Sequence, residues 1–250
     1  MNRFIATTVW SSLGLLAACG VNVPVTGIWT QADEMSPAVW NAEVKTRLEK
    51  FTVPSLTASQ ESYSKKFSVE GVHGRKFVYL MESDDDVKAA TKSKPQGLTK
   101  LCPRYGLLTP ISKALVWTSI LDALSFSETK YSVQLTYPEK FKDSDGNPVV
   151  STGLFQLSQE SARAHGGSCQ GASTEKLKDA DFNVLCSYQI LSNQILRTEV
   201  LFYEDREFYY WSTFSRGRNP GGFARFMGRL SQLMRDGDRW PQSCGLPDSF

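Results

Sequence analysis

The sequence contains few histidines and no closely paired cysteines, the residue types that most often bind zinc. It has only two histidines, His73 and His165, and no Cys-x-x-Cys pair among its five cysteines, so we expect no metal site and no cofactor. The formal net charge is only +2 and no long basic run occurs, which argues against a nucleic-acid-binding protein. Internal repeats and low-complexity tracts are also absent, and 41% apolar residues among 250 fit an ordinary globular protein.

The first twenty residues are typical of an exported protein. Arg3 precedes a weakly polar, apolar run that ends in small residues, which is too short and too interrupted to span a membrane in the mature protein. Residues 16–19, LAAC, resemble the lipobox of bacterial lipoproteins. That resemblance implies acylation of Cys19, a membrane anchor of acyl chains and, because Gly20 follows, a place in the outer membrane facing the periplasm. An ordinary signal peptide cleaved nearby is the alternative.

Four cysteines remain after Cys19, and an even number in an exported chain favours disulfides over free thiols. Three pairings are possible. We favour Cys169–Cys186, which closes a short local loop, and Cys102–Cys244, which ties the start of the domain to its end.

Composition divides the chain into three parts. Residues 1–18 form the signal peptide, residues 19–100 a tether and N-terminal extension, and residues 101–250 a helical domain. In the extension, apolar spacing predicts a helix over 38–51, alternation predicts a short β-hairpin over 67–81, and the charged segment 82–97 is expected to be a solvated loop.

The third part is predicted to be mainly helical. Thr109 as a cap and Pro110 at the first position begin a helix that reaches Glu128. Further helices are expected from Asp181, over 204–216 and over 220–235, the last two closed by glycines. The turn-rich residues 131–152 separate the first two helices. The expected fold is therefore mainly α (α+β), with a long central loop or small hairpin.

Glu128 is the most unusual residue of the first helix. It continues an apolar stripe formed by Trp117, Leu121 and Leu124, whose other members face the core. Partial desolvation and the negative end of the helix dipole both raise the pKa of a carboxyl group at that position. A carboxylic acid that stays protonated near neutral pH is what a general acid requires. Spacing alone also allows a frayed helix end with a solvated side chain.

Four motifs in order resemble the lysozyme-like superfamily, and more closely its soluble lytic transglycosylase branch. They are ETKY at 128–131, GLFQ at 153–156, DFNVLCSYQIL at 181–191 and YWS at 210–212. The resemblance covers roughly residues 101–235 and implies that Glu128 is the catalytic acid of an enzyme that cleaves peptidoglycan glycan strands. Thr129 and Ser187 depart from the usual Ser and Gly of the family.

The loop that contains GLFQ is expected to line the glycan cleft, after Ser151 and its Val-Val lead-in. Gly153 allows a positive φ and a close approach to ligand, Leu154 and Phe155 would hold the loop in the core, and the Gln156 amide has a donor and an acceptor for a sugar. A buried amide that satisfies loop backbone is the alternative for Gln156. Tyr210 matches a tyrosine that approaches the catalytic glutamate in this family, although core packing is equally plausible.

The presence of a second carboxylate near Glu128 would distinguish between two possible reactions. Lysozyme-type hydrolysis uses one, whereas a lytic transglycosylase forms a 1,6-anhydro product without it. Glu139 is the first candidate for this second carboxylate, and Asp143 and Asp145 are the next. As alternatives, these residues form a solvated acidic loop, or Glu139 recognises a cationic de-N-acetylated sugar. Peptidoglycan and the anchoring membrane are thus the expected partners, and a non-catalytic peptidoglycan-binding lipoprotein is the competing function. The oligomeric state is not predicted.

Overall fold

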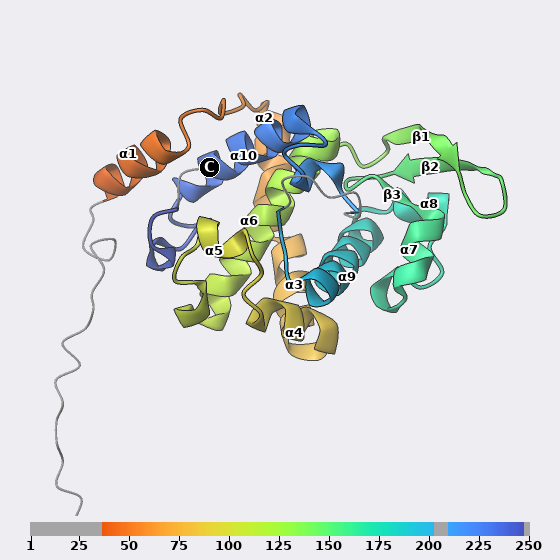
Figure 1. Ribbon diagram of the computed structural model, residues 1–250, viewed down its shortest axis with the longest axis horizontal. Helices are drawn as coiled ribbons and strands as arrows, with labels where there is room; N and C mark the ends of the chain where they lie inside the picture. Colours follow the sequence, from red (N-terminus) through yellow and green to blue (C-terminus); the bar gives the residue numbers. More distant parts are fainter. Residues whose placement is uncertain (1–36, 203–209, 248–250) are drawn as a thin grey trace, which may run out of the picture.

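The computed structural model describes residues 37–202 and 210–247 (Figure 1). The signal peptide, Cys19 and residues 20–36 of the tether lie outside the described residues. The described chain is mainly helical with one small antiparallel sheet, as predicted. No helix within these ranges is long and apolar enough to cross a bilayer.

Helices precede and follow the three strands, which are consecutive in the middle of the sequence, and short 3-10 helices (η) lie between several of the α-helices. In order they are α1 (Pro37–Arg47), α2 (Ala58–Ser64), η2 (Lys65–Phe67), α3 (Val72–Ser83), α4 (Asp85–Lys92), α5 (Leu98–Leu101), η3 (Tyr105–Leu107), α6 (Pro110–Thr129), β1 (Thr136–Lys142), β2 (Pro148–Thr152), β3 (Leu157–Ser158), α7 (Gln159–His165), η4 (Gly167–Cys169), α8 (Thr174–Leu177), α9 (Ala180–Thr198), η5 (Ser212–Phe214), α10 (Pro220–Met234) and η6 (Gln242–Cys244).

Helix α6 runs through the middle of the molecule and packs against α10 and α3 (Figure 1). It begins as predicted, because the Thr109 hydroxyl accepts a hydrogen bond from the Ser112 backbone N–H and Pro110 occupies the first turn. Trp117, together with the rest of the apolar stripe, is buried. The helix ends at Thr129, and the next residue, Lys130, has a left-handed conformation that turns the chain immediately after Glu128 and Thr129.

The segment before residue 100 contributes to the same hydrophobic core as the later helices. Phe67 and Phe77 are buried, and the Phe77 ring lies 6.4 Å from the Trp117 ring. The predicted hairpin over 67–81 is wrong, since residues 72–83 form α3, and the predicted loop over 82–97 contains α4, capped by Asp84. Alternation misled because α3 buries Phe77 and Leu80 at helical spacing.

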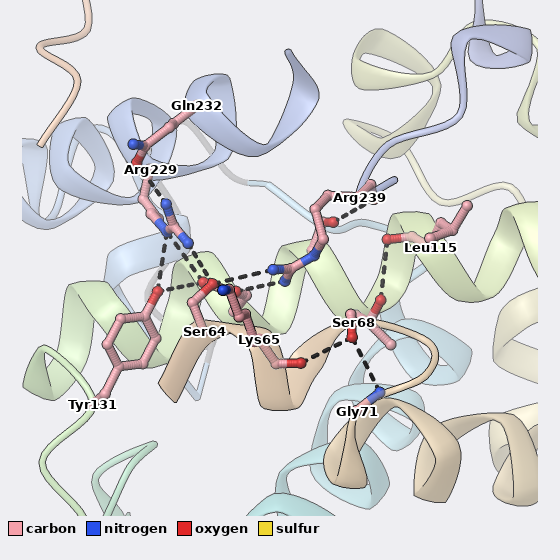
Figure 2. A network of polar contacts seen from close by, with 12 residues as sticks. Ser64, Lys65, Ser68, Gly71, Leu115, Tyr131, Arg229, Gln232 and Arg239 are labelled. Atoms are coloured by element: carbon pink, nitrogen blue, oxygen red, sulfur yellow. Dashed lines mark hydrogen bonds and ion pairs between the residues drawn. The ribbon is translucent and has the colours of Figure 1, made fainter. Parts of the chain in front are cut away.

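A buried polar network joins α2, α6 and α10 (Figure 2). The Asp122 carboxylate accepts hydrogen bonds from Arg229 Nε at 3.2 Å and from Arg239 at 2.6 Å. Ser64 and Tyr131 also donate to it. A single carboxylate thus compensates two guanidinium groups inside the protein, and the network fixes the turn that follows α6.

The three strands form a sheet of order β1-β2-β3 with antiparallel pairing. Tyr137 pairs with Ser151, but the register shifts between Pro138 and Lys142, so the strand is irregular around Glu139. Such bulges redirect side chains and are frequent beside functional sites. The small hairpin expected in the middle of the domain is therefore present.

Both favoured disulfides form, Cys102–Cys244 and Cys169–Cys186. The predicted helices from Asp181 and from Pro220 correspond to α9 and α10. The helix predicted over 204–216 is wrong where the structure describes it, because only a single 3-10 turn, η5, forms there; residues 203–209 lie outside the described chain.

Candidate functional site

A cleft of about 410 Å³ opens between the end of α6, the sheet and the segment before η5. It brings together five of the predicted site residues, Glu128, Glu139, Ser151, Gln156 and Tyr210. The other lining residues are Phe141, Val149, Ser158, Ser161, Trp211, Ser212 and Arg218. Both predicted catalytic carboxylates therefore face one hollow of the size of a ligand site.

Glu128 lies in the last turn of α6 and is partly buried. The Thr213 hydroxyl donates a hydrogen bond of 2.5 Å to Glu128 Oε1. On the adjacent residue, the Thr129 hydroxyl donates to the Leu154 carbonyl at 3.1 Å and so ties the helix end to the loop behind the cleft. The position of Glu128 is thus fixed from two sides.

The surroundings of Glu128 favour its protonated form. Burial raises the pKa of Glu128 to about 7, and the nearby charge of Glu139 adds to the increase, whereas the Thr213 hydrogen bond and the positive charge of Arg225 lower it. Burial has the largest effect because partial exclusion of water leaves the carboxylate less well solvated than it is in the unfolded chain. At neutral pH this carboxyl group therefore holds a proton in a substantial fraction of molecules and can donate it.

Glu139 approaches the cleft from β1, at the irregular part of that strand. The Ser151 hydroxyl of β2 donates a hydrogen bond of 2.5 Å to Glu139 Oε1. Ser151 is itself buried, so it holds this carboxylate from the neighbouring strand. The bond explains the place of Ser151 in the site, because it orients the Glu139 side chain beside the cleft.

The loop around Gly153 is held from behind by Asn183 of α9. The Asn183 side chain donates to the Thr152 carbonyl at 3.1 Å and accepts from the Phe155 backbone N–H at 3.0 Å. Gly153 has the expected positive φ, 78°. A Cβ there would lie 2.3 Å from the Leu177 carbonyl oxygen and 2.4 Å from Asn183 Nδ2, so the close approach that requires glycine is to the protein interior, whereas we expected a ligand.

The remaining residues of GLFQ serve the loop itself. Leu154 and Phe155 are fully buried, as expected for residues that hold the loop in the core. Gln156 lines the cleft, but its Nε2 donates to the Gly153 carbonyl at 3.0 Å and to the Leu135 carbonyl at 3.2 Å. Its amide nitrogen thus satisfies loop backbone, the alternative named for this residue, and only the amide oxygen is left without a hydrogen-bond donor in the described chain.

Tyr210 lines the cleft and does not hydrogen-bond Glu128. Its hydroxyl accepts from the Ser158 backbone N–H at 3.0 Å, and burial raises the pKa of Tyr210 to about 12. The next residue, Trp211, is buried and donates from its indole nitrogen to the Phe155 carbonyl at 2.8 Å. Tyr210 and Trp211 therefore line one side of the cleft and hold the GLFQ loop and the residues after it in place by hydrogen bonds.

Asp143 and Asp145 lie outside the cleft. Asp143 Oδ1 accepts hydrogen bonds from the backbone N–H groups of Asp145 and Asn147, so it organises the exposed turn between β1 and β2. Neither aspartate is placed to assist Glu128. Within the described ranges, no three His, Cys, Asp or Glu side chains gather in a way that would hold a metal ion.

Thr213, Arg225 and Arg218 are among the residues of the site that were not predicted. Thr213 bonds Glu128, Arg225 of α10 affects its pKa, and Arg218 lines the cleft. All three lie more than 80 residues from Glu128 in sequence. No spacing rule relates them to it, so only the fold brings them together.

Three solved structures of one Bdellovibrio protein, Bd0314 DslA, resemble this chain. The wild-type form 2 matches with a TM-score of 0.56 and 24% identity over 72% of this chain and 96% of its own. Two Glu-to-Gln variants match with TM-scores of 0.55 and 0.52, at 23% and 21% identity, over 73% and 83% of this chain and 96% and 94% of theirs. At this identity the similarity establishes a shared fold. No family model and no curated protein matches the sequence.

Proposed function

We propose that the protein cleaves the β-1,4 glycan strands of peptidoglycan between N-acetylmuramic acid and N-acetylglucosamine, with Glu128 as the general acid. The observation that carries the proposal is a carboxyl group with a pKa of about 7 inside a cleft that also holds a second carboxylate. Paired carboxyl groups in different environments are typical of glycoside-cleaving sites.

In the proposed reaction the protonated Glu128 carboxyl donates its proton to the glycosidic oxygen as the bond from that oxygen to the sugar breaks. The leaving sugar departs as a neutral alcohol, and positive charge develops on the sugar that remains. Arg225 and Thr213 lower the pKa of Glu128, so they stabilise the carboxylate that forms once the proton has left.

Glu139 supports hydrolysis over anhydro-sugar formation. It shares the cleft with Glu128 and is oriented by Ser151, which suits a carboxylate that stabilises the cationic sugar or directs a water molecule onto it. Phe141 is 61% exposed on the same strand and offers a sugar ring an apolar face at the rim.

The spacing of two glutamates in the similar structures supports the choice of Glu128 and Glu139 as the pair. The two glutamates substituted in the variants of Bd0314 DslA are 11 residues apart, which is also the separation of Glu128 and Glu139.

The two residues that depart from the family pattern have structural roles outside the cleft. The Thr129 hydroxyl donates a hydrogen bond to the Leu154 carbonyl, and the Ser187 hydroxyl donates one to the Val184 carbonyl inside α9.

Mass spectrometry of digested sacculi tests the proposal. The chain from Gly20 onward, which retains every described residue, is incubated with native and with chemically de-N-acetylated sacculi. Glu128→Gln, Glu139→Gln and the exposed control Glu160→Gln on α7 are run beside it.

Products with reducing ends that disappear with both cleft variants and persist with Glu160→Gln would support hydrolysis. Anhydro products that disappear only with Glu128→Gln would support the transglycosylase reaction. Sacculi of both kinds left intact by the wild-type chain would refute the enzyme and favour a non-catalytic peptidoglycan-binding protein.

A further inference from the structure

Two large apolar side chains project into solvent near the N-terminal end of α6. Leu107, at the end of η3, is 78% exposed, and Ile111, in the first turn of α6, is 52% exposed. They are only four residues apart in sequence. Exposed apolar residues that lie together mark binding surfaces more often than isolated ones do.

A hollow of about 550 Å³ lies beside Ile111, between α3, α4 and α6. Its apolar lining comes from Val78 and Met81 of α3 and from Pro110, Ile111 and Ala114 of α6. Lys88 and Lys92 of α4 and Lys113 of α6 surround it, and Glu82 is the single carboxylate among the lining residues. An apolar floor with a cationic rim fits a ligand that is apolar at one end and anionic at the other.

The lysines of this surface repel one another. Burial lowers the pKa of Lys113, and the positive charges of Lys94 and Lys92 lower it further. The Lys94 side chain lies against Gly106, directly before Leu107, which places a fourth ammonium group near Leu107. None of the four ammonium groups forms an ion pair with a carboxylate of the described chain. Negative charge from outside would relieve this repulsion.

We propose that this lysine face, defined by Leu107, Ile111, Lys88, Lys92, Lys94 and Lys113, docks on a membrane of anionic phospholipid. The two apolar side chains enter the interface between head groups and acyl chains, and the four ammonium groups lie at the level of the phosphates. A bilayer supplies the apolar and the anionic components together, whereas a soluble anion would leave Leu107 and Ile111 exposed.

The location of the lysine face relates it to the glycan cleft. Pro110 and Glu128 lie at opposite ends of α6, about 27 Å apart at the rise of an α-helix. Docking through the N-terminal end of α6 therefore directs the cleft away from the bilayer. This inference does not depend on the reaction proposed for the cleft, nor on acylation of Cys19.

Flotation with lipid vesicles measures the docking directly. The chain from Gly20 onward has no Cys19 and hence no acyl anchor, and it is mixed with vesicles of pure phosphatidylcholine or of phosphatidylcholine with 30% phosphatidylglycerol. We expect binding to the anionic vesicles that weakens with salt, and much weaker binding to the neutral ones. Since each lysine near an anionic surface contributes about fivefold in affinity, Lys92→Gln with Lys113→Gln should lose roughly 25-fold.

Two matched controls make the test specific. Lys45→Gln with Lys65→Gln removes the same charge from exposed positions on α1 and η2 and should change binding less than threefold. Leu107→Ser with Ile111→Ser should lose roughly tenfold, whereas Leu196→Ser, at a residue 40% exposed on α9, should have no effect.

Absence of binding to anionic vesicles, or equal losses in the control variants, would overturn the proposal. So would full release of the protein from vesicles by millimolar inorganic phosphate, because the face would then bind a soluble anion. Equal melting temperatures for all variants exclude unfolding as the cause of any loss.

Discussion

Replacement of Glu128 by glutamine should stabilise the protein at alkaline pH. The folded chain partly removes the Glu128 carboxyl group from water and raises its pKa from 4.5 to about 7. A group whose folded pKa is raised contributes stability below its unfolded pKa, and that contribution is lost as the pH rises through the folded pKa. The window in which wild-type stability falls is therefore between about pH 4.5 and pH 7.

The size of the effect follows from the two pKa values. A difference between 4.5 and about 7 corresponds to roughly 3 kcal/mol of destabilisation once the carboxylate is ionised. Glutamine has the same shape, accepts the Thr213 hydrogen bond and carries no charge. The free energy of unfolding of Glu128→Gln relative to the wild type should therefore rise by roughly 3 kcal/mol between pH 4 and pH 8.

Urea unfolding followed by circular dichroism at pH 4, 6 and 8 measures this difference. Glu160→Gln, the exposed control, should show no comparable pH-dependent gain. The inference that Glu128 is desolvated would be refuted if the Glu128→Gln variant were no more stable than the wild type at pH 8 and the difference in their free energies of unfolding were the same at pH 4 and pH 8.

Three further variants test the site and its support. Thr213→Val removes a bond that lowers the pKa of Glu128, so the alkaline limb of a sacculus-digestion pH profile should move up by about one pH unit; an unchanged limb would contradict that role. Gly153→Ala places a Cβ against Asn183 at a positive φ and should destabilise by at least 2 kcal/mol in urea unfolding; wild-type stability would contradict the close approach. Asp122→Asn leaves two buried guanidinium groups without a counter-ion and should cost about 3–5 kcal/mol; a cost below 1 kcal/mol would contradict the network.

Local signals were sufficient for the long helices and for one catalytic candidate. Thr109 and Pro110 mark the beginning of α6 because capping depends on neighbouring residues only. The stripe of α6 singled out Glu128, since helical spacing places it on the face that packs. The disulfide Cys169–Cys186 could also be predicted from the sequence, because the loop that it closes is short.

Tertiary contacts determine the features that were missed. Alternation over 67–81 indicated strands, but packing against α6 and α9 selects a helix whose buried face includes Phe77. Thr213 reaches Glu128 across 85 residues of sequence, so no local pattern announces it. Glycine at 153 was interpreted as room for a ligand, whereas its actual neighbour is Asn183 from α9.

Binding and cleavage of sacculi by Glu128→Gln, measured in the same sample at pH 6, tests the central claim most directly. A general acid contributes about 100-fold to 10,000-fold to a proton-transfer step, and the uncharged isostere keeps the shape of the cleft. We predict that the variant binds sacculi within about threefold of the wild type and releases soluble fragments at least 100-fold more slowly. Fragment release at the wild-type rate would contradict the role assigned to Glu128.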